Sequence, residues 1–183
     1  QELSNIPDQN YYYANETAGF KSVSVTYITG TAGNDSIKGT DGIDHIDGKS
    51  GDDSIYAGGD NDTVFVSGGT NFISGGDGND IVNGDSGNDV IFGNGGDDHL
   101  NGGAGNDTLF GSENNDVFYG ESGKDVLYGG SGDDLLFGGL DDDILYGGAG
   151  NDTYVFCFGE GYDTISDNHG NNALQFGQGI AVK

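Results

Sequence analysis

The chain has 183 residues, of which 38 are glycine, and its formal net charge at neutral pH is −26. Hydrophobic residues make up only 33% of the chain, a composition close to that of disordered proteins. With 5 Lys and Arg in total, the chain lacks the positive surface that nucleic acids and anionic membranes require, so its composition excludes both partners and favours a cation.

Two further features concern processing and location. Cys157 is the single cysteine, so no intramolecular disulfide can form. No apolar run approaches the roughly 18 residues of a membrane span, and the N-terminus lacks the order of a signal peptide. We therefore expect no membrane span, and because the chain contains no Met we expect it to be a piece of a longer protein.

Residues 1–29 form the first of three predicted segments, an N-terminal flank. In the stretch SVSVTYIT, Val23, Val25 and Tyr27 alternate with polar residues, which is typical of a half-buried strand. Because an open stack of strands needs cover at its ends, we expect this strand to cap the segment that follows.

Residues 30–155 form fourteen units of nine residues without an insertion. The first position is Gly in twelve units. The sixth position is Asn71 in one unit and Asp in the others, namely Asp35, Asp44, Asp53, Asp62, Asp80, Asp89, Asp98, Asp107, Asp116, Asp125, Asp134, Asp143 and Asp152. The eighth position is always apolar or aromatic: Ile37, Ile46, Ile55, Val64, Ile73, Val82, Ile91, Leu100, Leu109, Phe118, Leu127, Leu136, Leu145 and Tyr154.

This pattern predicts an all-β fold, a parallel β-roll (β-solenoid) of tandem nonapeptide repeats with capping segments at both ends. Each unit reads as a six-residue glycine-rich turn followed by a three-residue strand whose middle side chain points inward. Two units make one coil, so alternate units stack on the same side. The aspartates then form two columns, one on each side of the solenoid.

Stacked carboxylates of this kind indicate a metal. Strands of a sheet lie about 4.8 Å apart, and unit charges at that spacing repel by about 3 kcal/mol per pair at an effective dielectric constant near 20. Ca²⁺ reverses this repulsion, since it prefers six or more oxygen ligands, whereas Mg²⁺ demands a smaller octahedral shell. Zinc requires Cys or His clusters, and His45, His99 and His169 are scattered.

The repeats resemble the RTX (repeats-in-toxin) family, whose nonapeptide is G-G-x-G-x-D-x-U-x. The units GGDGNDIVN, GGAGNDTLF, GGSGDDLLF and GGAGNDTYV match it at each diagnostic position. The resemblance implies that multiple Ca²⁺ ions, up to about twelve in the gaps between coils, are bound by the sixth-position aspartates and by carbonyl oxygens of the first four turn positions.

The implied ligands are the thirteen aspartates above together with a set of turn residues. Carried over unit by unit, these are Gly75, Gly76, Asp77, Gly78, Gly84, Ser86, Gly87, Gly93, Gly95, Gly96, Gly102, Gly103, Ala104, Gly105, Gly120, Ser122, Gly123, Gly129, Gly130, Ser131, Gly132, Gly147, Gly148, Ala149 and Gly150. Because Asn71 is neutral, we expect weak or missing sites in the gaps on either side of it.

Residues 156–183 form the predicted C-terminal capping segment. This part resembles the segment that follows the last repeat in RTX proteins. Its apolar residues are expected to cover the terminal coil, and they are Phe156, Phe158, Tyr162, Ile165, Leu174 and Phe176. The family's type I secretion signal is expected at or beyond this segment.

The first functional hypothesis is a calcium-triggered folding module. By the resemblance, the chain is disordered in low calcium, folds in extracellular calcium, and supports type I secretion and folding of a larger bacterial toxin, secreted enzyme or adhesin. Its partners are then calcium ions and, through the parent protein, the secretion apparatus.

The alternative hypothesis is a surface- or glycan-binding solenoid. The ninth positions of one column include Tyr56, Phe92, Phe110, Tyr128 and Tyr146, which predicts an aromatic ladder on one outer face. We expect no enzyme activity and no catalytic residues, because the sequence contains neither H-E-x-x-H nor G-x-S-x-G.

Overall fold

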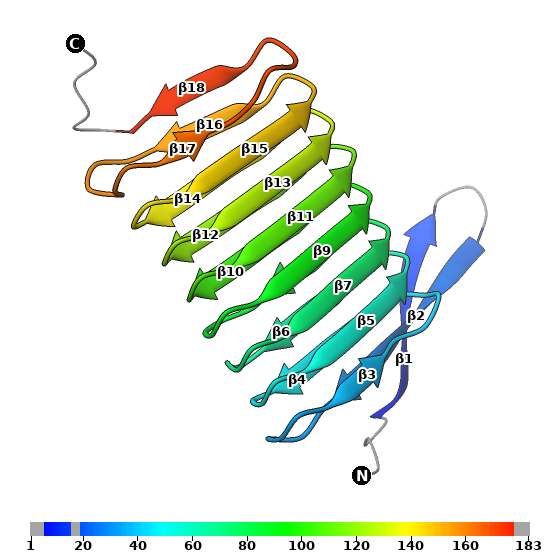
Figure 1. Cartoon of the computed structure of the whole chain (residues 1–183). Coiled ribbons are helices and arrows are strands. Elements are labelled where there is room, and N and C mark those ends of the chain that lie inside the picture. The colour runs from blue at the N-terminus through cyan, green and yellow to red at the C-terminus, as the bar shows by residue number, and fades with distance from the viewer. Residues whose placement is uncertain (1–5, 16–18, 178–183) are drawn as a thin grey trace.

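The computed structural model describes residues 6–15 and 19–177, with side chains described from Ser24 onward, as two sheets of strands joined by turns (Figure 1). The side chain of Val23 and residues 1–5, 16–18 and 178–183 lie outside this description. Across the described ranges, no helix is long and apolar enough to cross a membrane.

The first sheet has ten strands in the order β1-β2-β4-β6-β8-β10-β12-β14-β16-β18. Their bounds are β1 Ile6–Asn15, β2 Gly19–Thr29, β4 Asp44–Lys49, β6 Thr63–Val66, β8 Ile81–Asn83, β10 His99–Ala104, β12 Val117–Ser122, β14 Leu135–Leu140, β16 Thr153–Phe156 and β18 Ala173–Phe176. β1 pairs with β2 in antiparallel fashion, and each later pair is parallel. The N-terminal flank thus joins the sheet through β2.

The second sheet has eight parallel strands in the order β17-β15-β13-β11-β9-β7-β5-β3. Their bounds are β3 Ser36–Lys38, β5 Ser54–Gly59, β7 Phe72–Asp77, β9 Val90–Gly95, β11 Thr108–Glu113, β13 Val126–Ser131, β15 Ile144–Ala149 and β17 Thr164–Ile165. Leu109 pairs with Ile91 on one side and Leu127 on the other, a shift of two repeats. Two repeats therefore make one coil, and the predicted parallel β-roll is confirmed.

Most strands are longer than the three residues that the repeat predicted. β9, for example, runs from Val90 through Gly95, so it includes the first three positions of the next repeat. Within that strand Asn94, at the second position, has φ 81°, yet pairing continues to the third position. Many of the strands end there because the fourth position is again left-handed, as at Gly96, so the true turn is three residues long.

The core is one cluster made of two rows of side chains, one row from each sheet. Each eighth-position side chain from Ile37 to Tyr154 is buried, as predicted. Its two neighbours in the strand are more exposed, except that Val155 beside Tyr154 is also buried. Stacked side chains in successive coils make the core contacts, so each coil is held mainly by the coils before and after it.

Truncation of one such side chain should weaken the whole stack. We expect Leu109→Ala to lower the free energy of unfolding by about 2 to 5 kcal/mol, because Leu109 is completely buried and truncation leaves a cavity. Ile81→Ala is the matched control, since Ile81 is 49% exposed, and it should cost less than about 1 kcal/mol. Urea unfolding in saturating calcium measures both, and equal losses would contradict this account of the core.

Candidate metal centre

The sixth-position aspartates lie in two rows along the solenoid, and each uses one carboxylate oxygen to link two coils. Oδ1 of Asp98 accepts a hydrogen bond of 2.8 Å from the backbone N–H of Asp80, in the preceding coil. Oδ1 of Asp107 accepts the same bond from Asp89. This contact recurs along both rows, so the carboxylates are held rigidly inside the stack.

The second carboxylate oxygen has no such partner in most coils. Oδ2 is buried and accepts no hydrogen bond in eleven of the aspartates, namely Asp53, Asp62, Asp80, Asp89, Asp98, Asp107, Asp116, Asp125, Asp134, Asp143 and Asp152. A buried carboxylate oxygen without a donor costs far more free energy than a solvated one. A row of them on each side is therefore the strongest sign of a cation in this structure.

Backbone carbonyl oxygens point into the same gaps from both sides. A Cβ on Gly84, at the first position, would lie 2.6 Å from the carbonyl oxygen of Gly102 in the next coil and would overlap Oδ2 of Asp89. From the coil below, the carbonyl oxygen of Asp85 points at Gly103 and that of Gly87 at Gly105. The first-position carbonyl of the next coil thus lies near Oδ2, and the second- and fourth-position carbonyls point along the stack at the turn of the next coil.

The predicted backbone ligands therefore fall into two groups. First-, second- and fourth-position residues direct carbonyls along the stack, as described above. Third-position carbonyls instead accept hydrogen bonds from fourth-position N–H groups of the preceding coil, which the structure shows for Gly95, Ala104, Ser122 and Ala149. The strand ladder thus already uses one lone pair of these third-position oxygens.

In the first two turns a threonine at the second position donates to the aspartate four residues later. The backbone N–H of Thr31 donates to Oδ2 of Asp35 at 2.6 Å, and its hydroxyl donates to the same oxygen at 3.0 Å. Thr40 and Asp44 repeat both contacts. Threonine at the second position thus supplies donors to Asp35 and Asp44, both of which were predicted as metal ligands.

The unit that contains Asn71 differs in two coupled positions. Its first residue is Val66 in place of glycine, and the Val66 side chain lies beside Gly48, close to the place that Oδ2 of Asp53 also approaches. Asn71 uses its side-chain N–H to donate to Asp89 Oδ1 at 3.0 Å. A methyl group and a neutral amide thus replace charged oxygens here, which agrees with the expectation of weak sites beside Asn71.

A second ladder, at the fifth position, was not predicted. The backbone N–H of Asn106 donates to Oδ1 of Asn88 in the preceding coil at 2.8 Å, and Lys124 donates in the same way to Asn106. This ladder runs in the opposite direction to the aspartate ladder and is exposed. Its signal in the sequence is the Asn or Asp that precedes most sixth-position aspartates, which favours local side-chain to backbone bonds.

Burial raises the pKa of many of these aspartates, and the donated backbone N–H only partly offsets the effect of burial. The pKa of Asp116 rises to about 8, and burial also raises the pKa of Asp53, Asp107 and Asp152. The pKa is about 7 for Asp62, Asp80, Asp89 and Asp125, and about 6 for Asp98, Asp134 and Asp143. The folded chain therefore demands either protons or cations in these rows.

The oxygen donors fit calcium. Among the described residues no group of three or more His, Cys, Asp or Glu side chains converges, so a metal held here must take most of its ligands from backbone carbonyls. Carboxylate and carbonyl oxygens in a site of six or more ligands suit Ca²⁺, whereas zinc would require nitrogen or sulfur.

The fold and this oxygen-lined stack define a calcium-binding β-roll of nonapeptide repeats. The sequence profile of the RTX calcium-binding nonapeptide repeat matches residues 29–64, 38–73, 65–100, 92–127 and 119–154. The chain therefore belongs to the RTX calcium-binding nonapeptide repeat family. No curated protein matches the chain at significant similarity.

Adjacent residues provide a matched test of the aspartate row. We expect Asp98→Asn to raise the calcium midpoint of folding several-fold, because it keeps the Oδ1 acceptor for Asp80 but removes the buried charge. Asp97→Asn removes the same charge from the exposed fifth position, where Asn is common, and should leave the midpoint unchanged. Calcium titrations followed by circular dichroism compare the two, and equal shifts would mean that net charge alone sets the midpoint.

The raised pKa values predict an unusual pH dependence in chelator. An unfolded aspartate titrates near about 3.9, so between that pH and the folded pKa values of about 6 to 8 the unfolded state has lost protons that the folded state still holds. Stability in chelator should then be greatest at about pH 4 and fall as the pH rises through these values. Urea unfolding in chelator at several pH values measures this, and stability that rises with pH would contradict it.

Proposed function

We propose that the chain is a calcium-switched folding module, disordered without calcium and folded as a β-roll when calcium binds. The observation that carries this proposal is the set of eleven buried, unpartnered Oδ2 atoms aligned in the gaps between coils. Without a cation, folding must bury adjacent like charges or take up protons, and near neutral pH both are costly.

The ligands would come from two coils at once. In the gap above Asp107, Oδ2 of Asp107 and carbonyl oxygens of the turns that begin at Gly102 and Gly120 would hold Ca²⁺. The bound ion would neutralise the stacked carboxylates and link successive coils. On this basis the number of ions follows the number of charged gaps, so fewer than twelve are expected among the fourteen repeats, since Asn71 is neutral.

The switch suits a protein that folds after export. Family membership and the strong negative charge support an extracellular location, where calcium is abundant, and a parent protein that leaves a bacterial cell by type I secretion. An unfolded, highly charged chain stays extended. Folding outside the cell would then oppose backward movement and help an attached toxin, enzyme or adhesin domain to fold.

The aromatic ladder gives less support to the glycan-binding alternative. Phe92, Phe110, Tyr128 and Tyr146 stack with ring centroids 4.6 to 4.8 Å apart and interplanar angles of 2 to 7°. Phe72 lies between Tyr56 and Phe92 in this row, with its ring centroid 5.6 Å from that of Tyr56 and 5.5 Å from that of Phe92. Because each ring covers the face of the next, few ring faces remain for a sugar, and the ladder stabilises the outer surface of the sheet instead.

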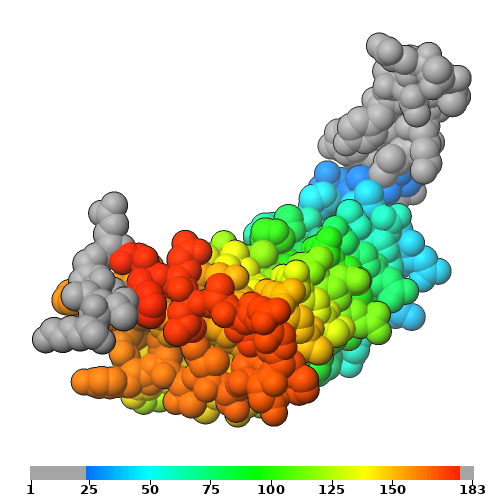
Figure 2. Space-filling model, turned by 90° about the horizontal axis from the view of Figure 1, so that it is seen from above, coloured from blue at the N-terminus to red at the C-terminus, as the bar shows by residue number. Residues whose placement is uncertain are grey.

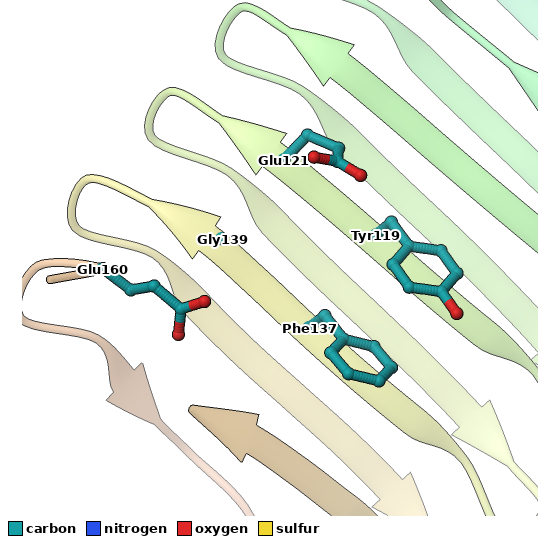
Figure 3. A pocket seen from close by; sticks show the side chains of 5 residues that line it. All are labelled: Tyr119, Glu121, Phe137, Gly139 and Glu160. Carbon is teal, nitrogen blue, oxygen red and sulfur yellow. The ribbon is translucent and has the colours of Figure 1, made fainter. Parts of the chain in front are cut away.

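The same proposal includes no catalytic role. Figure 3 shows one surface hollow, of about 170 Å³, in which the rings of Tyr119 and Phe137 lie side by side with the carboxylates of Glu121 and Glu160 nearby. These rings stack at 4.8 Å on neighbouring strands. The hollow thus presents two stacked rings and two carboxylates, to which the proposal assigns no reaction.

Circular dichroism in chelator, titrated with calcium from micromolar to tens of millimolar, tests the switch. We expect a cooperative transition from coil to β structure with calcium and none with magnesium over the same range. A chain that is already β-rich in chelator at neutral pH, or that responds equally to both ions, would refute the proposal.

A further inference from the structure

Two more nine-residue units follow the fourteen repeats, but two inserted residues separate them from the regular run. Phe156 and Cys157 are two extra residues after Val155. From Phe158 the nine-residue pattern resumes as FGEGYDTIS and DNHGNNALQ, with Asp163 and Asn172 at the sixth positions. Neither unit lies within the segments that match the RTX repeat.

The structure stacks these units as one more coil. β17 pairs in parallel with β15, with Thr164 opposite Ile144, and β18 pairs with β16, with Ala173 opposite Thr153. In Figure 2 this coil, coloured orange to red, lies at the end of the body remote from the blue residues of the first coil. The sequence offset between paired residues is eighteen in the repeats and twenty here. The increase of two equals the length of the Phe-Cys insertion.

Both hydrogen-bond ladders continue into this last coil. The backbone N–H of Asp143 donates to Oδ1 of Asp163 at 3.0 Å, and that of Asp152 donates to Oδ1 of Asn172 at 2.9 Å. On the outer ladder, the N–H of Tyr162 donates to Asp142. The last coil thus has the same backbone to side-chain hydrogen bonds as the repeats.

The prediction that the apolar side chains of the C-terminal segment cover the terminal coil is wrong for most of them. Phe156 and Ile165 pack against the core, but Phe158 is 80% and Tyr162 90% exposed. Leu174 is at an inward eighth position and is still 55% exposed, because no further described strand covers β18. Apolar burial alone therefore holds this coil weakly.

The gap beneath the last coil has the same oxygen lining as the others. Oδ2 of Asp143 and Oδ2 of Asp152 are buried without partners, although no regular repeat follows them. The carbonyl oxygen of Asp141 points at Gly161, as fourth-position carbonyls do elsewhere in the stack. Asp163 completes one side of the gap with a second carboxylate.

On the other side Asn172 is neutral, and Asp167 provides the carboxylate. Asp167 is at a first position, where most units have glycine. Its Oδ2 accepts hydrogen bonds from the Tyr154 hydroxyl at 2.6 Å and from the Asn172 side chain at 2.7 Å. A Cβ on Gly147 would overlap both Oδ2 of Asp152 and the hydroxyl oxygen of Tyr154, which donates to Asp167, so the two carboxylates lie close together.

We propose that the last coil carries two further calcium sites, one formed by Asp143 and Asp163 and the other by Asp152 and Asp167. These sites fasten residues 158–176 to the solenoid. This inference rests on the proposed calcium-binding function of the repeats and extends it to residues outside the nonapeptide run. It assigns Asp163 and Asp167 as ligands.

Charge-removing variants that keep the hydrogen-bond acceptors test the proposal. Asp163→Asn can still accept from Asp143, and Asp167→Asn can still accept from Tyr154. Each should bind one calcium ion fewer in equilibrium dialysis. Hydrogen exchange should show that protection of β17 and β18 requires at least tenfold more calcium, while β9, β11 and β13 keep the wild-type midpoint.

Asp133→Asn is the matched control, since Asp133 is an exposed fifth-position residue whose Oδ1 accepts from Asn151. It should change neither the ion count nor the midpoint. Unchanged ion counts and calcium midpoints in the two test variants would overturn the proposal. An unchanged ion count with protection of β17 and β18 lost at every calcium concentration would also overturn it, because that result indicates a structural role for the two aspartates. Failure of the proposed calcium switch would give a different result, namely protection of β9, β11 and β13 from hydrogen exchange in the wild-type chain in chelator. In that case the ion count of the variants would still test the sites of the last coil.

Discussion

The stacking of one buried carboxylate above another is the constraint on which the rest of this structure depends. A parallel β-roll with a two-repeat coil places the same residue at the same height in each coil, so a single Asp in the repeat becomes a row. Fixing Oδ1 to the backbone of the preceding coil, as Asp98 does with Asp80, leaves Oδ2 buried and without a donor. The fold therefore places rows of unpaired carboxylate oxygens where cations can bind.

The turns are shaped around that row. A side chain at the first position would collide with Oδ2 of the aspartate five residues later, as Gly84 and Asp89 show. Where Val66 and Asp167 stand at first positions, the sixth residues are Asn71 and Asn172, whereas Ala57 and Phe158 precede the charged Asp62 and Asp163. Glycine beneath the aspartate is thus the usual arrangement in the repeats, and the few first-position side chains occur with both amides and carboxylates at the sixth position.

The nine-residue period was sufficient to predict the parallel β-roll, the core column and the two aspartate rows, because each depends only on the spacing of residues. Strand length was wrong because it depends on pairing between coils, which lets a left-handed residue such as Asn94 remain within a strand. The threonine closure of the first turns depends on one hydroxyl and one N–H at Thr31, a contact that spacing does not reveal. The last coil was missed because two inserted residues shifted the phase of an otherwise recognisable pattern.

The distribution of charge along the stack determines how its coils cooperate. In a solenoid each coil contacts mainly its neighbours, so a cation shared by two coils adds directly to the interface between them. Around Asn71 one side of the solenoid has a methyl group and an amide in place of charged oxygens, while on the opposite side the carboxylates of Asp62 and Asp80 remain unpartnered. Every gap from Asp62 onward therefore retains at least one charged side, and calcium can couple the stack continuously through its weakest coil.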